Sequence, residues 1–296
     1  MIRSMTGFAS AKGAYGSFQW NWELRGVNAK GLDMRLRAPD WLEGLEAALR
    51  AEIGKAVSRG NVTLSLRLAR IEAGAEVSLN RAALSSVLDA LGEVEAEAAR
   101  RKIPLAPSRA TDLIALRGVM EVGSGDEDPA PLVTQLKAEF PALLESFVEM
   151  RETEGRALEE ILRDQLSRIA TLTTKAAELA EARRPQMAAT LRANLARVLE
   201  NADGAEPDRV AQELALLSVK ADVTEEIDRL GAHVDAARAL LDQGGAVGRK
   251  LDFLMQEFNR EANTLCSKAQ NAELTAAGLD LKALIDQMRE QVQNVE

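Results

Sequence analysis

The residues best suited to chemistry gather between positions 222 and 268 of this 296-residue chain. The stretch holds the only histidine, His233, and the only cysteine, Cys266. At about 100° per residue, four polar side chains would lie within about 60° of one another on a helix: Asp222, Glu226, Arg229 and His233. Acids, a guanidinium and an imidazole on one face are suited to acid–base or metal chemistry.

A second helix, predicted from about Val247 to Ala269, carries a second polar flank beside its apolar stripe. Its members would fall within about 40° of one another: Lys250, Glu257, Glu261, Thr264 and Lys268. Asn259 and Asn263 lie on the opposite flank. Because asparagine is a poor helix former, two of them one turn apart indicate specific hydrogen bonding to a neighbouring helix or to a ligand.

Two acid pairs, Asp222 with Glu226 and Glu257 with Glu261, predict an oxygen-rich site for Mg²⁺ or Mn²⁺ if the two helices face each other. The stripe from Asp222 to His233 is about 16 Å long, so a single ion cannot contact all of it. The spacing also differs from that of a helical zinc motif. Alternatively, the same charges form intrahelical ion pairs worth about 0.3–0.5 kcal/mol each, with a structural role only.

The elements that must position these residues indicate an α+β fold, with a small β-rich N-terminal domain followed by a large, mostly long-helix domain. Alternating apolar residues predict strands over 18–25 and 62–68, and Trp20 and Trp22 are interpreted as core. Helices are expected at about 42–53, 81–101, 111–118, 131–183 and 185–200, with a short strand over 76–79.

The predicted domains are 1–80 (basic and β-rich), 81–206 (long helices) and 207–296 (helical, carrying the site). Breaker-rich loops are expected at 123–129 and 201–208, and Gly244-Gly245 separates the two polar helices. A 4-3-4-3 apolar seam from Leu281 to Val295 is typical of a coiled coil. The seam packs either internally or against another subunit.

Composition limits the class of protein. Apolar residues make up 46% of the chain and aromatic residues only 3%, which favours helices packed through aliphatic side chains. No apolar run reaches the roughly 18 residues of a membrane span, and the first residues do not read as a secretory signal. A single cysteine fits a reducing compartment. We therefore expect a cytoplasmic protein without a membrane partner.

Charge is distributed unevenly along the chain. The net charge is −9, yet residues 1–70 hold 11 Lys and Arg against 6 Asp and Glu. Polyanion binding requires a local positive field rather than a positive total. The N-terminal module is therefore a candidate to bind nucleic acid, although a charge asymmetry without function remains the alternative.

Long motifs at both ends resemble the YicC/YloC family of bacterial endoribonucleases. They are MIRSMTGFA (1–9), ELRGVNAKGLDMRLRAP (23–39), RGNV (59–62), EEIDRLGAH (225–233), GRKLDFLMQEFNREANTLCSK (248–268) and EQVQNVE (290–296). The resemblance implies a cytoplasmic, divalent-metal-dependent ribonuclease that assembles as a homo-oligomer, a hexamer enclosing an RNA channel. Two departures stand out: Gly26 and Ala29-Lys30-Gly31 replace a Ser and a His-Arg-aromatic run of many relatives, and Cys266 replaces a frequent Gly.

The resulting hypothesis is metal-assisted cleavage of single-stranded RNA by a hydrolase. His233, Glu226, Glu257 and Arg229 are the expected catalytic residues, with His233 as general acid or base. The expected ligands of Mg²⁺ or Mn²⁺ are Asp222, Glu226, Glu257 and Glu261. The expected RNA-binding residues are Arg3, Arg25, Lys30, Arg35, Arg37, Arg249, Lys250, Arg260, Asn263 and Lys268.

Two alternatives stay open from the sequence. In the first, the RNA 2′-OH is the nucleophile, with His233 and a glutamate as the acid–base pair and no catalytic metal. In the second, the protein is a non-catalytic RNA-binding scaffold that recruits a separate nuclease, and other RNA-decay enzymes are then its partners.

Overall fold

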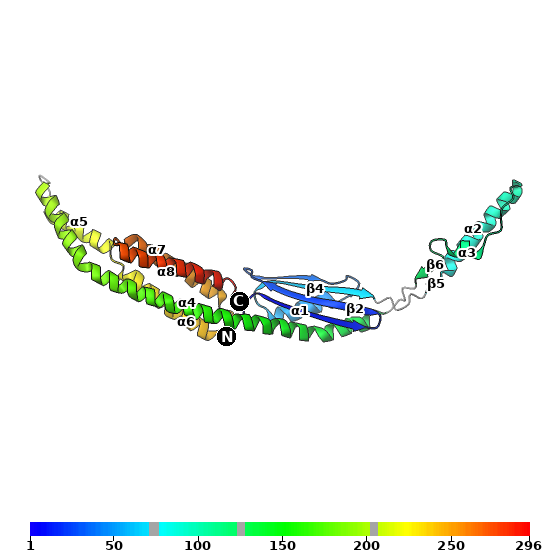
Figure 1. Cartoon of the computed structure of the whole chain (residues 1–296), viewed down its shortest axis with the longest axis horizontal. Helices are drawn as coiled ribbons and strands as arrows, with labels where there is room; N and C mark the ends of the chain where they lie inside the picture. Colours follow the sequence, from blue (N-terminus) through cyan, green and yellow to red (C-terminus); the bar gives the residue numbers. More distant parts are fainter. Residues whose placement is uncertain (71–76, 123–127, 202–206) are drawn as a thin grey trace. The chain divides into compact units, whose positions relative to one another are not determined.

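The computed structural model describes residues 1–70, 77–122, 128–201 and 207–296. A four-stranded sheet near the N-terminus is followed by a mostly helical region, which confirms the α+β class (Figure 1). The elements are β1 (Gly7–Tyr15), β2 (Phe18–Val27), β3 (Leu32–Arg37), α1 (Leu45–Ala56), β4 (Gly60–Arg70), β5 (Val77–Leu79), α2 (Arg81–Arg100), α3 (Ala110–Ile114), β6 (Met120–Val122), α4 (Ala130–Asn201), α5 (Pro207–Lys220), α6 (Thr224–Gln243), α7 (Gly248–Lys268) and α8 (Ala272–Val292).

The chain forms two compact units, each built from segments that are separate in sequence. Unit 1 comprises residues 1–11, 22–66 and 137–296, and unit 2 comprises 12–21 and 67–136. Unit 2 contains α2 and α3 together with the two-stranded antiparallel β5–β6 sheet. The predicted domains are consecutive segments, whereas each unit here combines segments that are separate in sequence. The predicted boundaries near 80 and 206 stay predictions.

The main sheet has the strand order β1-β2-β4-β3. β3 and β4 run parallel, with Met34 opposite Val62, and α1 forms the crossover between them. The predicted alternation is confirmed, because Trp20, Trp22 and Leu24 of β2 are buried. One face of the sheet is thus an apolar surface that helices must cover.

The N-terminal half of α4 packs on this sheet. The ring of Phe140 contacts Trp22 at a centroid distance of 5.8 Å, and Phe147 lies so close to Gly26 that a side chain there would collide with it. Gly26 is therefore required for close packing. This is a physical reason for one of the two departures noted in the sequence.

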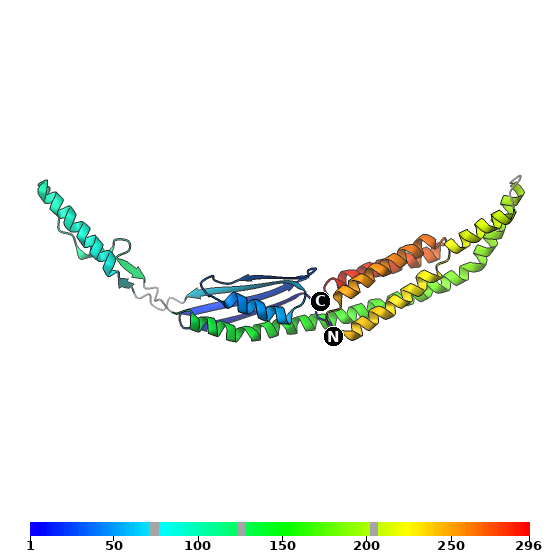
Figure 2. The same cartoon turned by 180° about the vertical axis from the view of Figure 1, so that it is seen from behind.

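The second half of unit 1 is a helical bundle of α4, α6, α7 and α8, which lie side by side (Figures 1 and 2). Its core includes Leu162, Leu230, Met255 and Phe258, all fully buried. The apolar seam of α8 also faces this core: Leu281, Ile285, Met288, Val292 and Val295. The seam therefore packs within the chain, which settles the alternative left open by the sequence.

A break at Pro185 was predicted, and it is wrong because α4 is one helix of 72 residues that contains both Pro141 and Pro185. A proline removes one backbone hydrogen bond, and it can kink a helix without ending it when contacts nearby hold the helix. Here Ala176 is buried before Pro185, and the Arg183 side chain donates hydrogen bonds to backbone carbonyls of other segments. The acidic loop at 123–129 and the turn at 201–208 lie largely outside the described residues.

The two ends of the chain meet on α4. Arg151 is fully buried and its Nη2 lies 3.1 Å from a carboxylate oxygen of Glu296, whose other oxygen accepts hydrogen bonds from the backbone and hydroxyl of Ser58. The Arg151 side chain also donates to the Ser4 carbonyl at 2.7 Å. Burial lowers the pKa of Arg151, and Glu296 opposes that shift. This junction joins the sheet to the start of the bundle helices.

Among the described residues, no helix combines the length and the apolar content that crossing a bilayer requires.

Candidate functional site

Helices α6 and α7 form an antiparallel hairpin whose tight link is set by glycines. Gly244 and Gly245 have φ values of 67° and 72°, a left-handed conformation that glycine adopts without strain. Gly248, the first residue of α7, abuts the Val295 carbonyl so closely that any side chain would collide with it. The C-terminal segment thus fixes where α7 starts, and hence which residues of α6 and α7 face each other.

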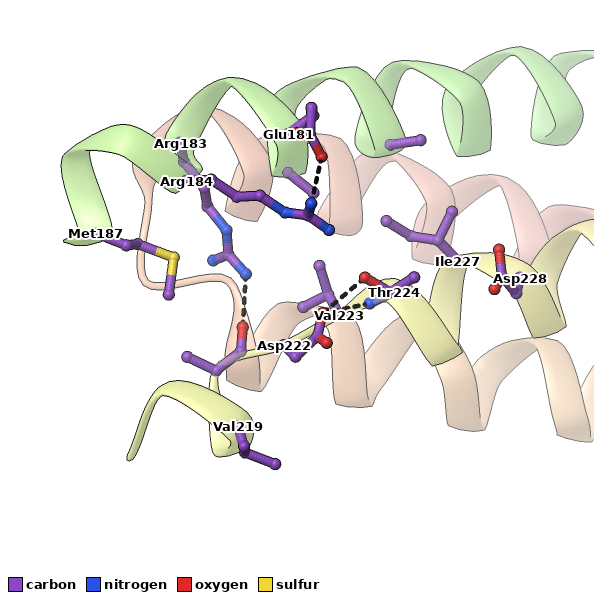
Figure 3. A pocket seen from close by; sticks show the side chains of 13 residues that line it. Glu181, Arg183, Arg184, Met187, Val219, Asp222, Val223, Thr224, Ile227 and Asp228 are labelled. Carbon is purple, nitrogen blue, oxygen red and sulfur yellow. Dashed lines mark hydrogen bonds and ion pairs between the residues drawn. The ribbon is translucent and has the colours of Figure 1, made fainter. Parts of the chain in front are cut away.

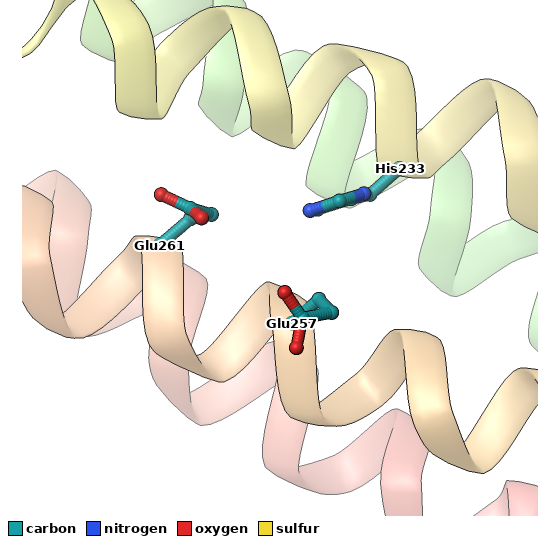
Figure 4. Close-up of side chains that lie close together, drawn as sticks. All are labelled: His233, Glu257 and Glu261. Atoms are coloured by element: carbon teal, nitrogen blue, oxygen red, sulfur yellow. The ribbon is translucent and has the colours of Figure 1, made fainter.

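The hairpin brings His233 of α6 together with Glu257 and Glu261 of α7 (Figure 4). One ligand atom from each residue lies within 4.8 Å of those of the other two, and within the described ranges this is the one group of histidine, cysteine or acidic residues so arranged. In Figure 4 the imidazole reaches from α6 toward the two carboxylates on α7. The two helices therefore face each other, the condition on which the predicted site depended, but the acids on α7 meet His233 rather than Asp222 and Glu226.

The imidazole of His233 is held by packing. Its ring meets Phe258 edge to face, with centroids 5.5 Å apart and an interplanar angle of 69°. Its Nε2 is buried and has no hydrogen-bond partner among the described residues. Because a buried polar atom without a partner costs free energy, such an atom points to a group that the protein alone does not supply.

The two carboxylates of the cluster, Glu257 and Glu261, differ in how closely positive side chains approach them. Glu261 is buried and lies 3.3 Å from Arg229, which also pairs with Glu225. The hydrogen bond from Arg229 to Glu261, then the charge of Glu225, raises the pKa of Arg229. Among the residues that the structure describes, the one cation paired with Glu257 is Arg260 at 4.0 Å, and the Arg260 side chain is 71% exposed. Exposed pairs at that distance contribute little, so negative charge at Glu257 is nearly uncompensated.

Glu226 and Lys268 form a separate pair nearer the open end of the hairpin. Lys268 Nζ lies 2.9 Å from Glu226 Oε1, and the Glu226 side chain is only 6% exposed. Its Oε2 is buried without a hydrogen-bond partner in the part of the chain that the structure describes. The pair joins α6 to α7. Lys268, one of the expected RNA-binding residues, therefore forms an ion pair with Glu226 in this structure.

Asp222 lies outside the helix, so its predicted place on one helical face with Glu226 is wrong. Helix α6 begins at Thr224, and Asp222 Oδ1 accepts hydrogen bonds from the backbone N–H of Thr224 at 3.0 Å and from its hydroxyl at 2.7 Å (Figure 3). These bonds, the hydroxyl first, lower the pKa of Asp222. A side chain that satisfies the free N–H groups of a helix start is engaged in capping.

Asp222 instead lines a pocket around Arg183 and Arg184 of α4 (Figure 3). Arg183 donates hydrogen bonds to the carbonyls of Ala221 at 2.6 Å and of Ala269, at the C-terminal ends of α5 and α7. Burial lowers the pKa of Arg183, and the charge of Asp222 opposes the shift. The sequence did not indicate this residue, because nothing local marks an arginine that caps distant helices.

The other expected RNA-binding residues are placed as follows. Arg3 is paired with Glu152 at 2.7 Å, while Arg25, Lys30, Arg35 and Arg37 are exposed on or beside the sheet. On α7, four of the expected residues have exposed side chains: Arg249, Lys250, Arg260 and Asn263.

A hydrogen bond from a side chain to the backbone connects α7 with the loop after β2. Arg249 Nη2 donates to the Lys30 carbonyl at 3.3 Å, so the loop after β2 lies against the start of α7.

Asn259 donates a hydrogen bond to Asp286 of α8 at 3.1 Å, so one of the two asparagines on α7 makes the contact with a neighbouring helix that the sequence indicated.

Comparisons with known proteins relate this chain to one family over nearly its whole length. Residues 2–160 match the model described as "Endoribonuclease YicC-like, N-terminal region", and residues 176–296 match "Endoribonuclease YicC-like, C-terminal". A Haemophilus influenzae protein named "Probable endoribonuclease YicC" is 41% identical over 303 aligned positions, and a Clostridioides difficile protein of the same name is 26% identical over 305. Both alignments cover 100% of this chain and of the relative.

Proposed function

This chain belongs to the YicC-like endoribonuclease family, and from that membership we propose that it cleaves single-stranded RNA with a divalent cation held by His233, Glu257 and Glu261. One observation supports this ligand set above the others. The buried Nε2 of His233 has no partner among the described residues and faces two carboxylates whose charge is incompletely paired. An imidazole nitrogen with two carboxylate oxygens is a donor set that first-row divalent metals accept.

The proposed set keeps Glu257 and Glu261 and replaces the other two expected ligands. Asp222 is engaged in capping and Glu226 in an ion pair, whereas His233 adds a nitrogen donor. Because Mg²⁺ prefers oxygen ligands in a strict octahedron, the mixed set favours Mn²⁺ over Mg²⁺. When bound, such a cation supplies a Lewis acid that stabilises charge on the phosphoryl oxygens and activates water.

The chain's own side chains would bind and orient the RNA. Arg229 holds the buried Glu261 in place, and its half-exposed guanidinium lies at the edge of the cluster, where it can pair with a phosphate. The exposed cations Arg249, Lys250 and Arg260 follow the same helix. Arg25, Lys30, Arg35 and Arg37 extend the positive surface over the sheet, as the uneven charge distribution predicts.

The metal proposal is tested by cleavage of a labelled single-stranded RNA with Mn²⁺, with Mg²⁺ and with EDTA. We expect cleavage with Mn²⁺, weaker cleavage with Mg²⁺ and none with EDTA. A substrate with a 2′-deoxy group at the cleavage site should still be cut, because the attacking group is then a water. Cleavage that persists in EDTA and disappears with the deoxy substrate would contradict the metal proposal and favour the 2′-OH mechanism.

Binding of the metal can be measured independently of activity. Mn²⁺ stabilises a protein whose folded state binds it, so it should raise Tm of the wild-type chain. The double variant Glu257→Gln/Glu261→Gln should lose that shift, while Asp222→Asn, which removes an acid outside the cluster, should keep it. A full shift in the double variant would place the ion elsewhere.

Assembly and the scaffold alternative are tested together. The proposal includes a cytoplasmic homo-oligomer, a hexamer in the resemblance, whose mass light scattering measures in solution. A scaffold that recruits another nuclease would bind RNA yet show no cleavage that Glu257→Gln removes. Cleavage that copurifies with wild-type protein and is lost in Glu257→Gln prepared identically would exclude a contaminating enzyme.

A further inference from the structure

An apolar patch lies on the same two helices as the His233 cluster, toward the closed end of the hairpin. Its centre is Phe253, whose side chain is 61% exposed, flanked by Leu254 of α7 and by Leu240 and Ala236 of α6. Phe253 is the most exposed aromatic side chain among the described residues, and burying its ring against a partner would be favourable by about 2 kcal/mol. The ring does not contribute to the bundle core, so a different use is indicated.

The patch continues the proposed site along one face. Phe253 precedes Glu257 by four residues and Leu254 precedes it by three, so these side chains lie within about 60° of Glu257 around α7 and one turn away from it. On α6, Ala236 and Leu240 follow His233 by three and seven residues. The surface therefore changes from two carboxylates to an aromatic ring over roughly 6 Å.

Positive charge borders the patch on the side away from the carboxylates. Lys250 and Arg249 line the same depression as Phe253, and both are exposed. Arg249 also holds the Lys30 carbonyl, which brings the loop of the basic N-terminal module beside the patch. An aromatic face next to cations is how proteins bind single-stranded nucleic acid, with bases stacked on the ring and phosphates on the cations.

We propose that Phe253 is a base-stacking subsite for a nucleotide next to the scissile phosphate, with Lys250 binding the adjoining phosphate. The inference rests on the proposed ribonuclease function, and it names the substrate class as RNA with an unpaired base at that position. Double-stranded RNA would not fit, because its bases are stacked on one another and cannot cover a protein ring. A second copy of this chain is a poorer occupant, because the cations Lys250 and Arg249 beside the ring match the phosphates of RNA.

The test measures binding without cleavage, so that it does not depend on the metal. The full chain in EDTA is titrated against a short fluorescent single-stranded RNA and against an abasic ribose-phosphate oligomer of the same length. We expect the wild type to bind the base-containing oligomer about tenfold more tightly. Phe253→Ala should abolish that difference while leaving the abasic affinity unchanged, and Phe253→Tyr should restore it.

Two further variants complete the experiment. Lys250→Ala should weaken both oligomers by the same factor and reduce the salt dependence of binding by about one ion. Leu279→Ala removes a 56% exposed apolar side chain from α8, so it should change neither affinity.

Several outcomes would overturn the subsite. An equal loss for both oligomers in Phe253→Ala would show that stacking is absent. A change in mass by light scattering, with RNA binding intact, would identify the patch as a contact between copies. Base-dependent binding without any Mn²⁺-dependent cleavage would instead support the subsite and refute the nuclease.

Discussion

Two charged clusters on the α6–α7 hairpin differ in how completely their charges are neutralised. At the open end, Glu226 is matched by Lys268 at 2.9 Å. Farther along, Glu257 and Glu261 lie beside a histidine whose Nε2 has no partner in the described part of the chain, and only Glu261 has a cation nearer than 4.0 Å. The matched pair is accounted for by its own charges, whereas the incompletely paired acids at Glu257 and Glu261 are the reason we propose a bound cation there.

The largest expected difference is in catalysis. Glu257→Gln removes a proposed ligand while preserving shape, so single-turnover cleavage of labelled RNA in Mn²⁺ should fall by about 100-fold or more. Glu226→Gln changes the matched cluster by the same chemistry, and its rate should stay within a few-fold of wild type. Equal losses in both variants would mean that the two clusters act as one site.

Stability should respond in the opposite order. Lys268→Met leaves the buried Glu226 carboxylate without its partner, and we expect a loss of about 2 kcal/mol in the free energy of unfolding. Urea denaturation measures it. The double variant Glu226→Gln/Lys268→Met should recover most of the loss, because no unpaired charge remains. Failure of the double variant to recover would show that Lys268 stabilises through its apolar stem.

Removing charge from the surplus cluster should have little cost to folding. In metal-free buffer, Glu257→Gln should change the free energy of unfolding by less than about 0.5 kcal/mol, and toward greater stability, because it relieves repulsion between Glu257 and Glu261. The same urea titration compares it with Lys268→Met. A loss as large as that of Lys268→Met would indicate a structural role for Glu257.

A modest effect that depends on pH is expected at Asp222, the acid outside both clusters. Hydrogen bonds from Thr224 lower its folded-state pKa, so its contribution is present above the unfolded pKa and lost as pH falls through the folded one. Asp222→Ala should therefore cost about 0.5–1 kcal/mol at pH 7, and the difference from wild type should vanish in acid. Unfolding midpoints measured at pH 7 and in acid check the sign. A difference that persists unchanged in acid would assign the effect to packing.

Features that depend on residues close in sequence could be predicted, and features that depend on contacts between distant segments could not. Strands β2, β4 and β5, the α6–α7 link and the core role of Trp20 and Trp22 were predictable, because periodicity and glycine placement are local properties. Strands β1, β3 and β6 were not predicted. Two expectations were wrong, the break at Pro185 and the helical position of Asp222. Helix α4 continues through Pro185, with Ala176 and Arg183 buried before it. The chain leaves the helical conformation between Lys220, where α5 ends, and Thr224, where α6 begins, and Arg183 of α4 binds the Ala221 carbonyl in that break.

One signal in the sequence could have grouped the site correctly. Around the Gly244-Gly245 link, residues of an antiparallel hairpin face one another when they are equally distant from the turn. His233 and Glu257 are each twelve residues from Gly245, and Arg229 and Glu261 are each sixteen residues away. Grouping acids by spacing within each helix paired Glu226 with Asp222, whereas in the hairpin Glu226 contacts Lys268, which is about one turn beyond the equidistant position.

The sequence by itself determined the family, the α+β class and the set of residues capable of chemistry, because motif identity and periodicity are written along the chain. Only the tertiary structure decided which acids are free. Whether a carboxylate is compensated depends on atoms supplied by another helix, such as Lys268 for Glu226, and on the burial of its neighbours, such as Nε2 of His233. Charge balance at a site is a property of three-dimensional neighbours, which spacing along one helix cannot reveal.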